Sequence, residues 1–473
     1  MYSHYMLNNG RLKVMLFRVY LTPFKFRKNI TKILLFDSNS YSCSSRKMER
    51  QQNGFSLSNF DVIGFDLDHT LCRYKLRPLF ELIYENMASF LVERRGYSKD
   101  LYKSYESGED FVQKGIVFDK LNGNFLKVSS DFLILKATHG TTPMTDEQIV
   151  KFYGENHTWD QLLELPEGLC RSDAQQKPYY VFRDYFVLPV ILICARLVDI
   201  VDKEYGSWLP CYNIWQDVYD GLIYMYRRDH FKDDVKGFFS NLKKNPENYL
   251  VPCSRAFLQW LLELKRDKKL FLLTSSNIDY ADFIGRFCLG DDWNEYFDIS
   301  FMFARKPGFF TSQRPFLTLN GMEEGEIISC DSLELKGVYS QGNWKDLKTF
   351  FSKVTGKQKP NILYVGDSII EDVFSPSNYG RCKTIAIVEE MKVGKYSEES
   401  NCLESKFWGS FFDYPSKGSN NGFSKTLWYE IISSHSILAI PDLEALSSLS
   451  LKCLVPFEND LEFAFYPNKP SNL

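Results

Sequence analysis

The sequence predicts an α/β protein whose parallel sheet has a second domain inserted after its first strand. Short apolar segments of strand type recur along the chain, and each of them ends in polar or charged residues. This pattern is typical of parallel sheets, which are covered on both faces and carry their functional groups at the carboxyl edge. About two hundred residues separate the first segment from the next, whereas a parallel crossover needs only about a dozen.

The first expected strand begins at Asp61 and ends in Asp66-Leu67-Asp68. Residues two apart in an extended segment point the same way, so the carboxylates of Asp66 and Asp68 can face one pocket. Two carboxylates this close repel each other unless a cation or a shared proton lies between them. The pair is therefore the first candidate for chemistry.

Residues 76–250 are expected to form the inserted domain, which we predict to be mainly helical. Pro78 can stand in the first turn of a helix, where its missing N–H costs nothing. Thr145 and Gln148 have the spacing of a capping box, and Asn213 can cap a further helix. The insertion shows no regular alternation of strands and helices.

Residues 55–75 and 251–473 are expected to form the core around the parallel sheet. Ser254 can cap a helix, and four further strands follow it. Residues 391–425 are rich in Ser, Gly, Asn and Lys and are expected to be loop, with Asp413–Ser424 the least structured part. The four expected strands are Leu270–Thr274, Phe297–Phe303, Asn361–Asp367 and Thr384–Val388.

Residues 1–54 are predicted to be a basic extension, because residues 1–36 contain no Asp or Glu and several Arg and Lys. A mitochondrial transit peptide at residues 1–47, a disordered arm, a short structured element and a true start at Met48 all fit this pattern. The 11 cysteines are odd in number and lack a C-x-x-C pair, which favours a reducing compartment such as the cytoplasm. Localisation is thus expected to be cytoplasmic, or mitochondrial if a transit peptide is present.

Composition narrows the classes of partner. The longest apolar run, Tyr185–Ala195, contains Pro189 and is shorter than the roughly 20 residues of a membrane span. The formal charge of -3 gives no basic field for nucleic acid. We therefore expect neither membrane nor nucleic-acid binding, and the oligomeric state stays open.

Polar residues follow the strands in a fixed order, and this order resembles the four motifs of the haloacid dehalogenase superfamily. The segments Phe-Asp-Leu-Asp-His-Thr-Leu, Leu-Leu-Thr, Ala-Arg-Lys-Pro-Gly-Phe-Phe and Leu-Tyr-Val-Gly-Asp-Ser are similar to the 5′-nucleotidase branch of that superfamily. Three shorter segments, at residues 313–316, 339–343 and 408–412, point to a narrower group within the branch. The motif residues are Asp66 and Asp68, Thr274 and Ser275, Lys306, and Asp367 with Asp372.

The resemblance implies a Rossmann-like core of three layers with a cap domain, and it implies roles for these residues. Asp66 would be the nucleophile, and Asp68 the general acid and base. Thr274, Ser275 and Lys306 would contact the phosphoryl group, although the branch has Thr-Asn where this chain has Thr274-Ser275, so only the threonine role transfers cleanly. Mg²⁺ would be held by the carboxylates of Asp66, Asp367 and Asp372 and by the backbone carbonyl of Asp68.

The expected function is a magnesium-dependent phosphomonoester hydrolase that works through an aspartyl phosphate on a small phosphorylated substrate, such as a nucleoside monophosphate. Two alternatives remain open: a catalytically idle descendant that binds proteins, and a nucleoside phosphotransferase that uses the same residues. The cluster that reads the base in the purine enzyme of the branch has no match in Asp217–Tyr226. Purine specificity is therefore not implied.

Overall fold

The computed structural model describes residues 54–171, 174–392, 403–415, 422–448, 451–452 and 455–456. The expected N-terminal extension lies outside these residues except for Gly54, and so do the stretches 393–402 and 416–421 of the expected loop. Within the described residues, no helix has the length and apolar character that a membrane crossing requires.

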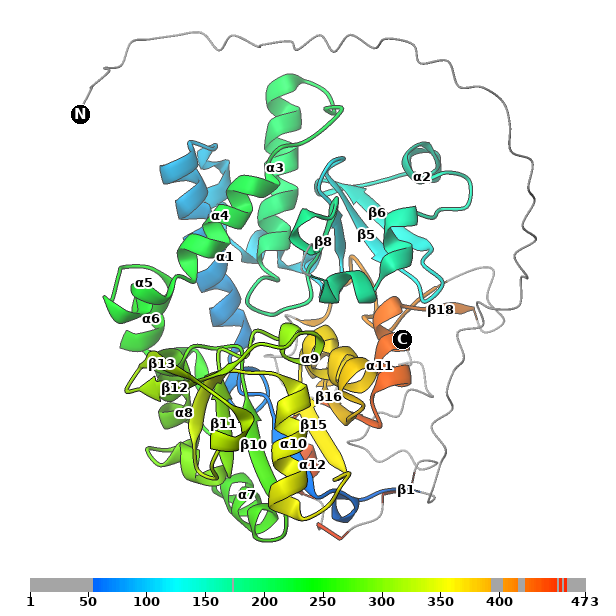
Figure 1. Cartoon of the computed structure of the whole chain (residues 1–473). Helices are drawn as coiled ribbons and strands as arrows, with labels where there is room; N and C mark the ends of the chain where they lie inside the picture. The colour runs from blue at the N-terminus through cyan, green and yellow to red at the C-terminus, as the bar shows by residue number, and fades with distance from the viewer. Residues whose placement is uncertain are drawn as a thin grey trace, which may run out of the picture. The chain divides into compact units, whose positions relative to one another are not determined.

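A nine-stranded sheet forms the centre of the fold (Figure 1). Seven neighbouring strands are parallel, and the antiparallel pair β12–β13 extends one edge. The mostly parallel sheet that the sequence predicts is therefore confirmed, and the first predicted strand, β2, lies between β10 and β15. In spatial order the strands are β13 (Glu323–Ile328), β12 (Phe316–Asn320), β14 (Val338–Gln341), β11 (Ile299–Met302), β10 (Lys269–Leu273), β2 (Val62–Phe65), β15 (Ile362–Gly366), β16 (Lys383–Ile387) and β19 (Leu438–Ile440).

Helices pack on both faces of the sheet because successive strand residues point to opposite sides. Val62 and Phe271 belong to the apolar core that contains helix α10 (Trp344–Thr355). Their chain neighbours Ile63 and Leu272 belong to a separate core that contains helices α7 (Arg255–Asp267) and α8 (Ile278–Leu289). This period of two explains why the central strands are apolar throughout. The remaining helices that follow β10 are α9 (Gly308–Thr311), α11 (Leu427–His435) and α12 (Leu443–Ser447).

The insertion, residues 76–250, contains helices and also a five-stranded antiparallel sheet that the sequence analysis did not predict. The expectation of a mainly helical segment is thus incomplete. The strands, in order, are β7 (Thr142–Pro143), β6 (Ile134–His139), β5 (Asn124–Val128), β4 (Val117–Asp119) and β8 (Tyr179–Val181). The helices are α1 (Leu76–Arg95), α2 (Asp146–Tyr153), α3 (Val190–Tyr205), α4 (Trp215–Met225), α5 (Arg228–Lys232) and α6 (Phe238–Lys244).

The chain enters and leaves the insertion through one pair of short strands. β3 (Arg73–Tyr74) pairs antiparallel with β9 (Leu250–Val251), next to the expected boundaries at residues 75 and 251. The two passages therefore lie side by side although more than 170 residues separate them in sequence.

Two of the three predicted helix caps are confirmed. The Thr145 side chain accepts from the Gln148 backbone N–H, and the Gln148 side chain accepts from that of Thr145. Ser254 accepts from the Phe257 backbone N–H at 3.1 Å. The prediction for Asn213 is wrong, because Ile214 already has helical backbone angles and stands as the residue before α4, without a side-chain cap.

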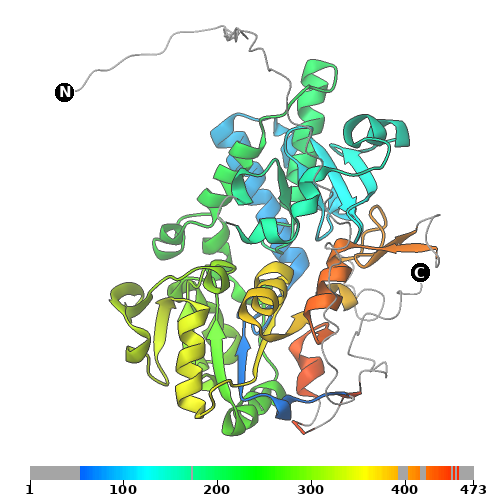
Figure 2. The ribbon, with the colours of Figure 1, turned by 45° about the vertical axis from the view of Figure 1, so that its right-hand side comes forward.

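The expected loop near the C-terminus contains a strand pair. β17 (Asp413–Pro415) and β18 (Phe423–Lys425) are antiparallel and appear in orange in Figure 2. Asp413–Ser424 was predicted to be the least structured part. This prediction is wrong at both ends of the range, because each end belongs to a strand. A similar short pair joins β1 (Gly54–Phe55) to β20 (Val455–Pro456).

Candidate active site

The carboxyl ends of the central parallel strands bring the predicted motif residues together. Asp66 follows β2 directly, and its backbone N–H donates to the Val365 carbonyl of β15 at 2.9 Å. Asp367 follows β15, and Thr274 follows β10 on the other side of β2. Since these strands are parallel and adjacent, their last side chains meet at one edge.

Three buried carboxylates form a cluster at this edge. Asp66, Asp367 and Asp372 each offer a carboxylate oxygen, and these oxygens lie within 4.8 Å of one another. Lys306 lies between two of them: its ammonium donates to Asp66 Oδ1 at 2.7 Å and to Asp372 Oδ1 at 2.5 Å. It also donates to the Tyr364 hydroxyl at 3.2 Å. Lys306 thus pairs with two of the three carboxylates, those of Asp66 and Asp372.

Asp372 is oriented by the start of the short π-helix Ile369–Phe374. Its Oδ2 accepts from the Ser368 backbone N–H at 3.1 Å, while its Oδ1 faces Lys306. Gly366 leaves room for this side chain, because a Cβ there would lie 2.5 Å from the Asp372 carboxyl carbon. The Asp372 side chain therefore contacts both the start of this helix and Lys306.

Burial raises the pKa of Asp66 well above its ordinary value; Lys306 lowers this pKa, and the carboxylates of Asp372 and Asp68 raise it. Burial likewise raises the pKa of Asp367, which Lys114 lowers. For Lys306, burial alone would lower the pKa, but the charges of Asp372 and Asp66 outweigh this and raise it. A cation in the cluster would favour the ionised carboxylates.

The donor set fits Mg²⁺. The cluster offers hard carboxylate oxygens, which Mg²⁺ prefers, and no sulfur or imidazole ligand from the described residues takes part in it. The fourth predicted ligand, the backbone carbonyl of Asp68, stays a prediction.

Asp68 stands apart from the cluster and accepts two hydrogen bonds. The Tyr74 hydroxyl donates to its Oδ1 at 2.7 Å, and the Ser276 hydroxyl donates to its Oδ2 at 2.7 Å. Burial raises the pKa of Asp68, whereas the hydrogen bonds from Ser276 and Tyr74 lower it. Neither Tyr74 nor Ser276 was among the predicted site residues, although Ser276 lies only two positions after Thr274.

The two hydroxyls of the second motif have different surroundings. Thr274 is buried, and its Oγ1 accepts from the Ser276 backbone N–H at 3.0 Å. Ser275 Oγ accepts from the Lys306 backbone N–H at 3.0 Å, so this side chain ties the second motif to the third. Their contacts with a phosphoryl group stay predictions.

The insertion also reaches this edge. Lys114 donates to the Asp367 backbone carbonyl at 3.4 Å, and Arg183 lies 3.6 Å from Glu371. The Tyr185 hydroxyl donates to Glu390 at 2.9 Å. Sequence reasoning missed all three insertion residues, since no motif marks them and only the folded insertion carries them to the strand ends.

Comparison with known proteins decides the family of the chain. The family model described as "5' nucleotidase family" matches residues 51–405. The chain belongs to this family. It is 37% identical to human 5'-nucleotidase domain-containing protein 1 over 447 residues, which cover 88% of the chain and 96% of that protein.

Two further proteins also match the chain, one at nearly the same identity and one at lower identity. The bovine protein of the same name is 36% identical, again over 88% of the chain and 96% of that protein. Rat 5'-nucleotidase domain-containing protein 2 is 28% identical over 72% of the chain and 59% of its own length. The similarity to a narrower group within the 5′ nucleotidase family, expected from residues 313–316, 339–343 and 408–412, is thereby confirmed.

His69, beside the acid pair, is buried within aromatic rings. Its ring lies 4.5 Å from that of Tyr74, 4.8 Å from Tyr185 and 4.9 Å from Phe186. Burial lowers its pKa well below the ordinary value. His69 is therefore a neutral packing residue beside the acid pair.

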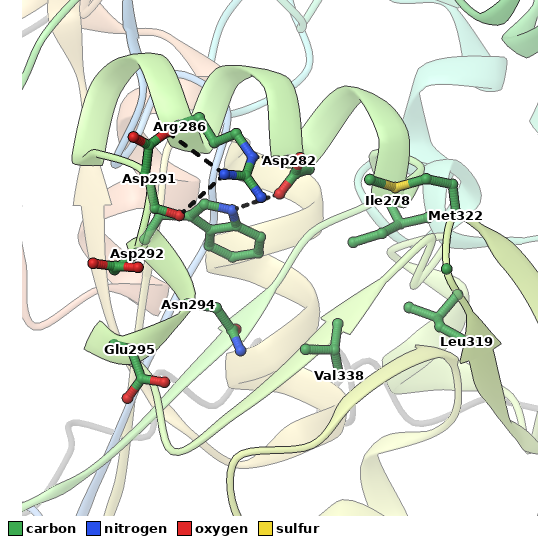
Figure 3. Close-up of a pocket in the computed structure, with 12 residues that line it drawn as sticks. Ile278, Asp282, Arg286, Asp291, Asp292, Asn294, Glu295, Leu319, Met322 and Val338 are labelled. Carbon is green, nitrogen blue, oxygen red and sulfur yellow. Dashed lines mark hydrogen bonds and ion pairs between the residues drawn. The ribbon is translucent and has the colours of Figure 1, made fainter.

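A cavity of about 430 Å³ lies between α8 and the β12–β13 hairpin (Figure 3). Arg286 and Trp293 both donate to Asp282 on its wall, at 2.7 and 3.0 Å. The predicted site residues take no part in its lining. The cavity is therefore separate from the carboxylate cluster.

Proposed function

We propose that the chain is a Mg²⁺-dependent phosphomonoesterase that acts on a nucleoside monophosphate or a similar small phosphomonoester. The observation that carries the proposal is the position of Asp66, whose carboxylate contacts Lys306 within the cluster that includes Asp367 and Asp372. Membership of the 5′ nucleotidase family supports the reaction class. The ordered motifs support a haloacid dehalogenase type of mechanism.

In the first step, an Asp66 oxygen forms a bond to phosphorus while the bond from phosphorus to the leaving oxygen breaks. Asp68 gives its proton to that oxygen, so an alcohol leaves and an aspartyl phosphate remains. The raised pKa of Asp68 keeps the proton available at higher pH than for an exposed aspartate. Lys306 offsets negative charge on Asp66 and on the transferring group.

In the second step, Asp68 accepts a proton from water, and the water oxygen attacks phosphorus. The bond to Asp66 breaks, inorganic phosphate leaves, and both carboxylates return to their first states. Mg²⁺ held by the Asp66, Asp367 and Asp372 carboxylates would supply electrostatic stabilisation of the transferring phosphoryl group.

The insertion would serve as a cap that closes over the strand ends. Lys114, Arg183 and Tyr185 already contact that edge. Closure of this kind controls the access of water to the site. Water must be kept out while Asp66 attacks phosphorus, and it must enter when the aspartyl phosphate is hydrolysed.

The direct test is phosphate release from a panel of nucleoside monophosphates and other phosphomonoesters with Mg²⁺. Wild-type protein should release phosphate, and Asp66→Asn should not, because an amide of the same size cannot attack phosphorus. Asp267→Asn, at an exposed position at the end of α7, is the matched control and should keep full activity. Activity retained by Asp66→Asn would exclude Asp66 as the nucleophile.

Two other outcomes of the panel identify the alternatives. If the phosphate is transferred to an added nucleoside instead of being released into solution, the chain is a phosphotransferase. Binding of protein partners by a wild-type chain that turns over no phosphomonoester would assign an idle descendant.

A further inference from the structure

Three lysines are almost fully buried in the part of the chain that the structure describes: Lys114, Lys127 and Lys306, with 3%, 3% and 7% of their surface exposed. Lys306 has two carboxylates and a tyrosine hydroxyl as partners. Lys127 donates to a side-chain amide oxygen and to two backbone carbonyls. Lys114 differs from both.

The Lys114 ammonium has weak protein partners for a buried charge. Among the residues that the structure describes, its one hydrogen bond goes to the Asp367 carbonyl and is 3.4 Å long, and its ammonium also lies 4.1 Å from the centroid of the Tyr185 ring. The charge of Lys114 lowers the pKa of the Asp367, Asp184 and Glu389 carboxyl groups, yet within the described residues none of these carboxylates lies within 4 Å of the ammonium. An ammonium has three donors, and burial of a charge is costly unless an anion or several acceptors satisfy it. The site is therefore built for a further acceptor.

The backbone holds Lys114 in this position. The next residue, Gly115, donates from its N–H to Phe182 at 2.6 Å, and its carbonyl accepts from the Trp428 indole at 2.9 Å. Gly115 has φ of +88°, and a Cβ there would lie 1.9 Å from the Trp428 ring nitrogen. The lysine is thus presented from a fixed segment, and little conformational freedom remains to be lost on binding.

We propose, on the basis of the proposed phosphatase function, that Lys114 binds the phosphoryl group of the substrate from the side of the insertion. Lys306 is engaged by Asp66 and Asp372, whereas Lys114 keeps donors for anionic oxygens beside Asp367. A phosphate dianion matches a buried ammonium in charge and in acceptors. Lys114 would then couple substrate binding to the contact between the insertion and the strand ends.

The alternative role for Lys114, which is to offset the charge of Asp367 only, predicts a different effect of its removal on ligand binding. If this lysine only offsets the charge of Asp367, its removal should strengthen the binding of Mg²⁺ and leave the binding of phosphate unchanged when Mg²⁺ is saturating. If it binds the phosphoryl group, its removal should weaken phosphate binding at saturating Mg²⁺.

The test is calorimetric titration of the full chain with inorganic phosphate at saturating Mg²⁺. Lys114→Met should raise the Kd for phosphate about 10-fold or more, as expected for lost hydrogen bonds to a charged group. Lys114→Arg should recover most of the affinity. Lys103→Met, at an exposed position of the insertion, is the control and should bind as wild type does.

Two results would overturn the inference. Unchanged phosphate affinity in Lys114→Met, with normal phosphate binding and turnover by wild type, would refute the role of Lys114 while leaving the proposed function intact. Absence of both phosphate binding and turnover in wild type would refute the proposed function and this inference with it. Lys114→Gln, which is polar and uncharged, replaces the methionine variant if circular dichroism shows that the latter does not fold.

Discussion

The Tyr74 hydroxyl donates a 2.7 Å hydrogen bond to Asp68, and the same hydroxyl lies 2.8 Å from that of Tyr280. Tyr74 belongs to β3, which pairs with the strand that returns from the insertion. The carboxylate to which we assign acid and base catalysis is therefore oriented by the strand pair at which the insertion begins and ends. A shift of that pair would alter the direction and the pKa of Asp68.

Tyr74→Phe and Ser276→Ala should each raise the pKa of Asp68, because each removes a hydrogen bond that favours the ionised form. A carboxyl group with a higher pKa stays protonated to higher pH. The acidic limb of the pH profile for breakdown of the aspartyl phosphate, which needs ionised Asp68, should move to higher pH. Steady-state rates across pH 4 to 8 would measure it, with the exposed Tyr205→Phe as control. An acidic limb that stays in place would show that another group titrates there.

Mg²⁺ should stabilise the fold through the carboxylate cluster. Binding to the native state alone adds about 2.7 kcal/mol at a hundred times the Kd, so the thermal midpoint should rise with Mg²⁺ concentration. Asp367→Asn should lose most of this rise, because it removes a charged ligand while keeping the side-chain volume. Asp267→Asn should keep it. A midpoint that is insensitive to Mg²⁺ in wild type, or full turnover in excess EDTA, would contradict the metal assignment.

The ends of β2, β10 and β15 were predictable from the sequence, because these central strands are mostly apolar and a polar residue follows each of them directly. The parallel strands β14 and β19 were not predicted, because β14 contains Ser340 and Gln341 and β19 has only three residues. The sheet of the insertion was not predictable from the sequence, because its strands contain buried polar residues that interrupt the apolar pattern of a strand. All five residues of β5 are buried, yet two of them are Asn124 and Lys127. Asn124 donates to Tyr153 at 3.0 Å, and such partners become visible only in three dimensions.

The site residues likewise divide into those that the sequence could place and those that only the folded chain brings to the site. Asp66 and Asp367 directly follow β2 and β15, so topology alone brings them to one edge. Lys306 lies in the loop after β11, and its motif marked it in the sequence. Lys114 and Ser276 depend on how a loop or the insertion folds over that edge, and neither a period nor a motif indicates their position.

Gly64→Ala should destabilise the protein strongly, because Gly64 stands opposite Phe271 in the centre of the sheet. A Cβ at residue 64 would lie 2.1 Å from the tip of the Phe271 ring, which is fully buried. Overpacking of this kind costs about 1–3 kcal/mol. The variant with Phe271→Leu in addition should recover part of the loss, so the two free-energy changes should not add. Urea unfolding of the two single variants and the double variant would measure the coupling, and simple additivity would exclude the predicted clash.

Lys127 should make the stability of the protein depend on pH. Its ammonium lies between β5 and the segment 403–415, where it donates to the Gln113 side chain and to the Trp408 carbonyl, both at 2.9 Å. Its pKa is lowered from 10.5 to about 7, chiefly by burial. The charge of Asp413 partly opposes this shift, and the charge of Lys136 adds to it. The folded chain therefore releases this proton at a lower pH than the unfolded chain does.

Between about pH 7 and pH 10.5 the unfolded chain binds the proton that folded Lys127 has released. The free energy of unfolding should therefore rise with pH across this window, by at most about 1.4 kcal/mol per pH unit from this group. Below pH 7 the penalty for burying the charge is fully present and constant. Urea unfolding at pH 7.5, 8.5 and 9.5 should show a shallower rise for Lys127→Met than for wild type, while exposed Lys103→Met should follow wild type. Parallel curves for wild type and Lys127→Met would mean that Lys127 stays charged in the fold throughout this range.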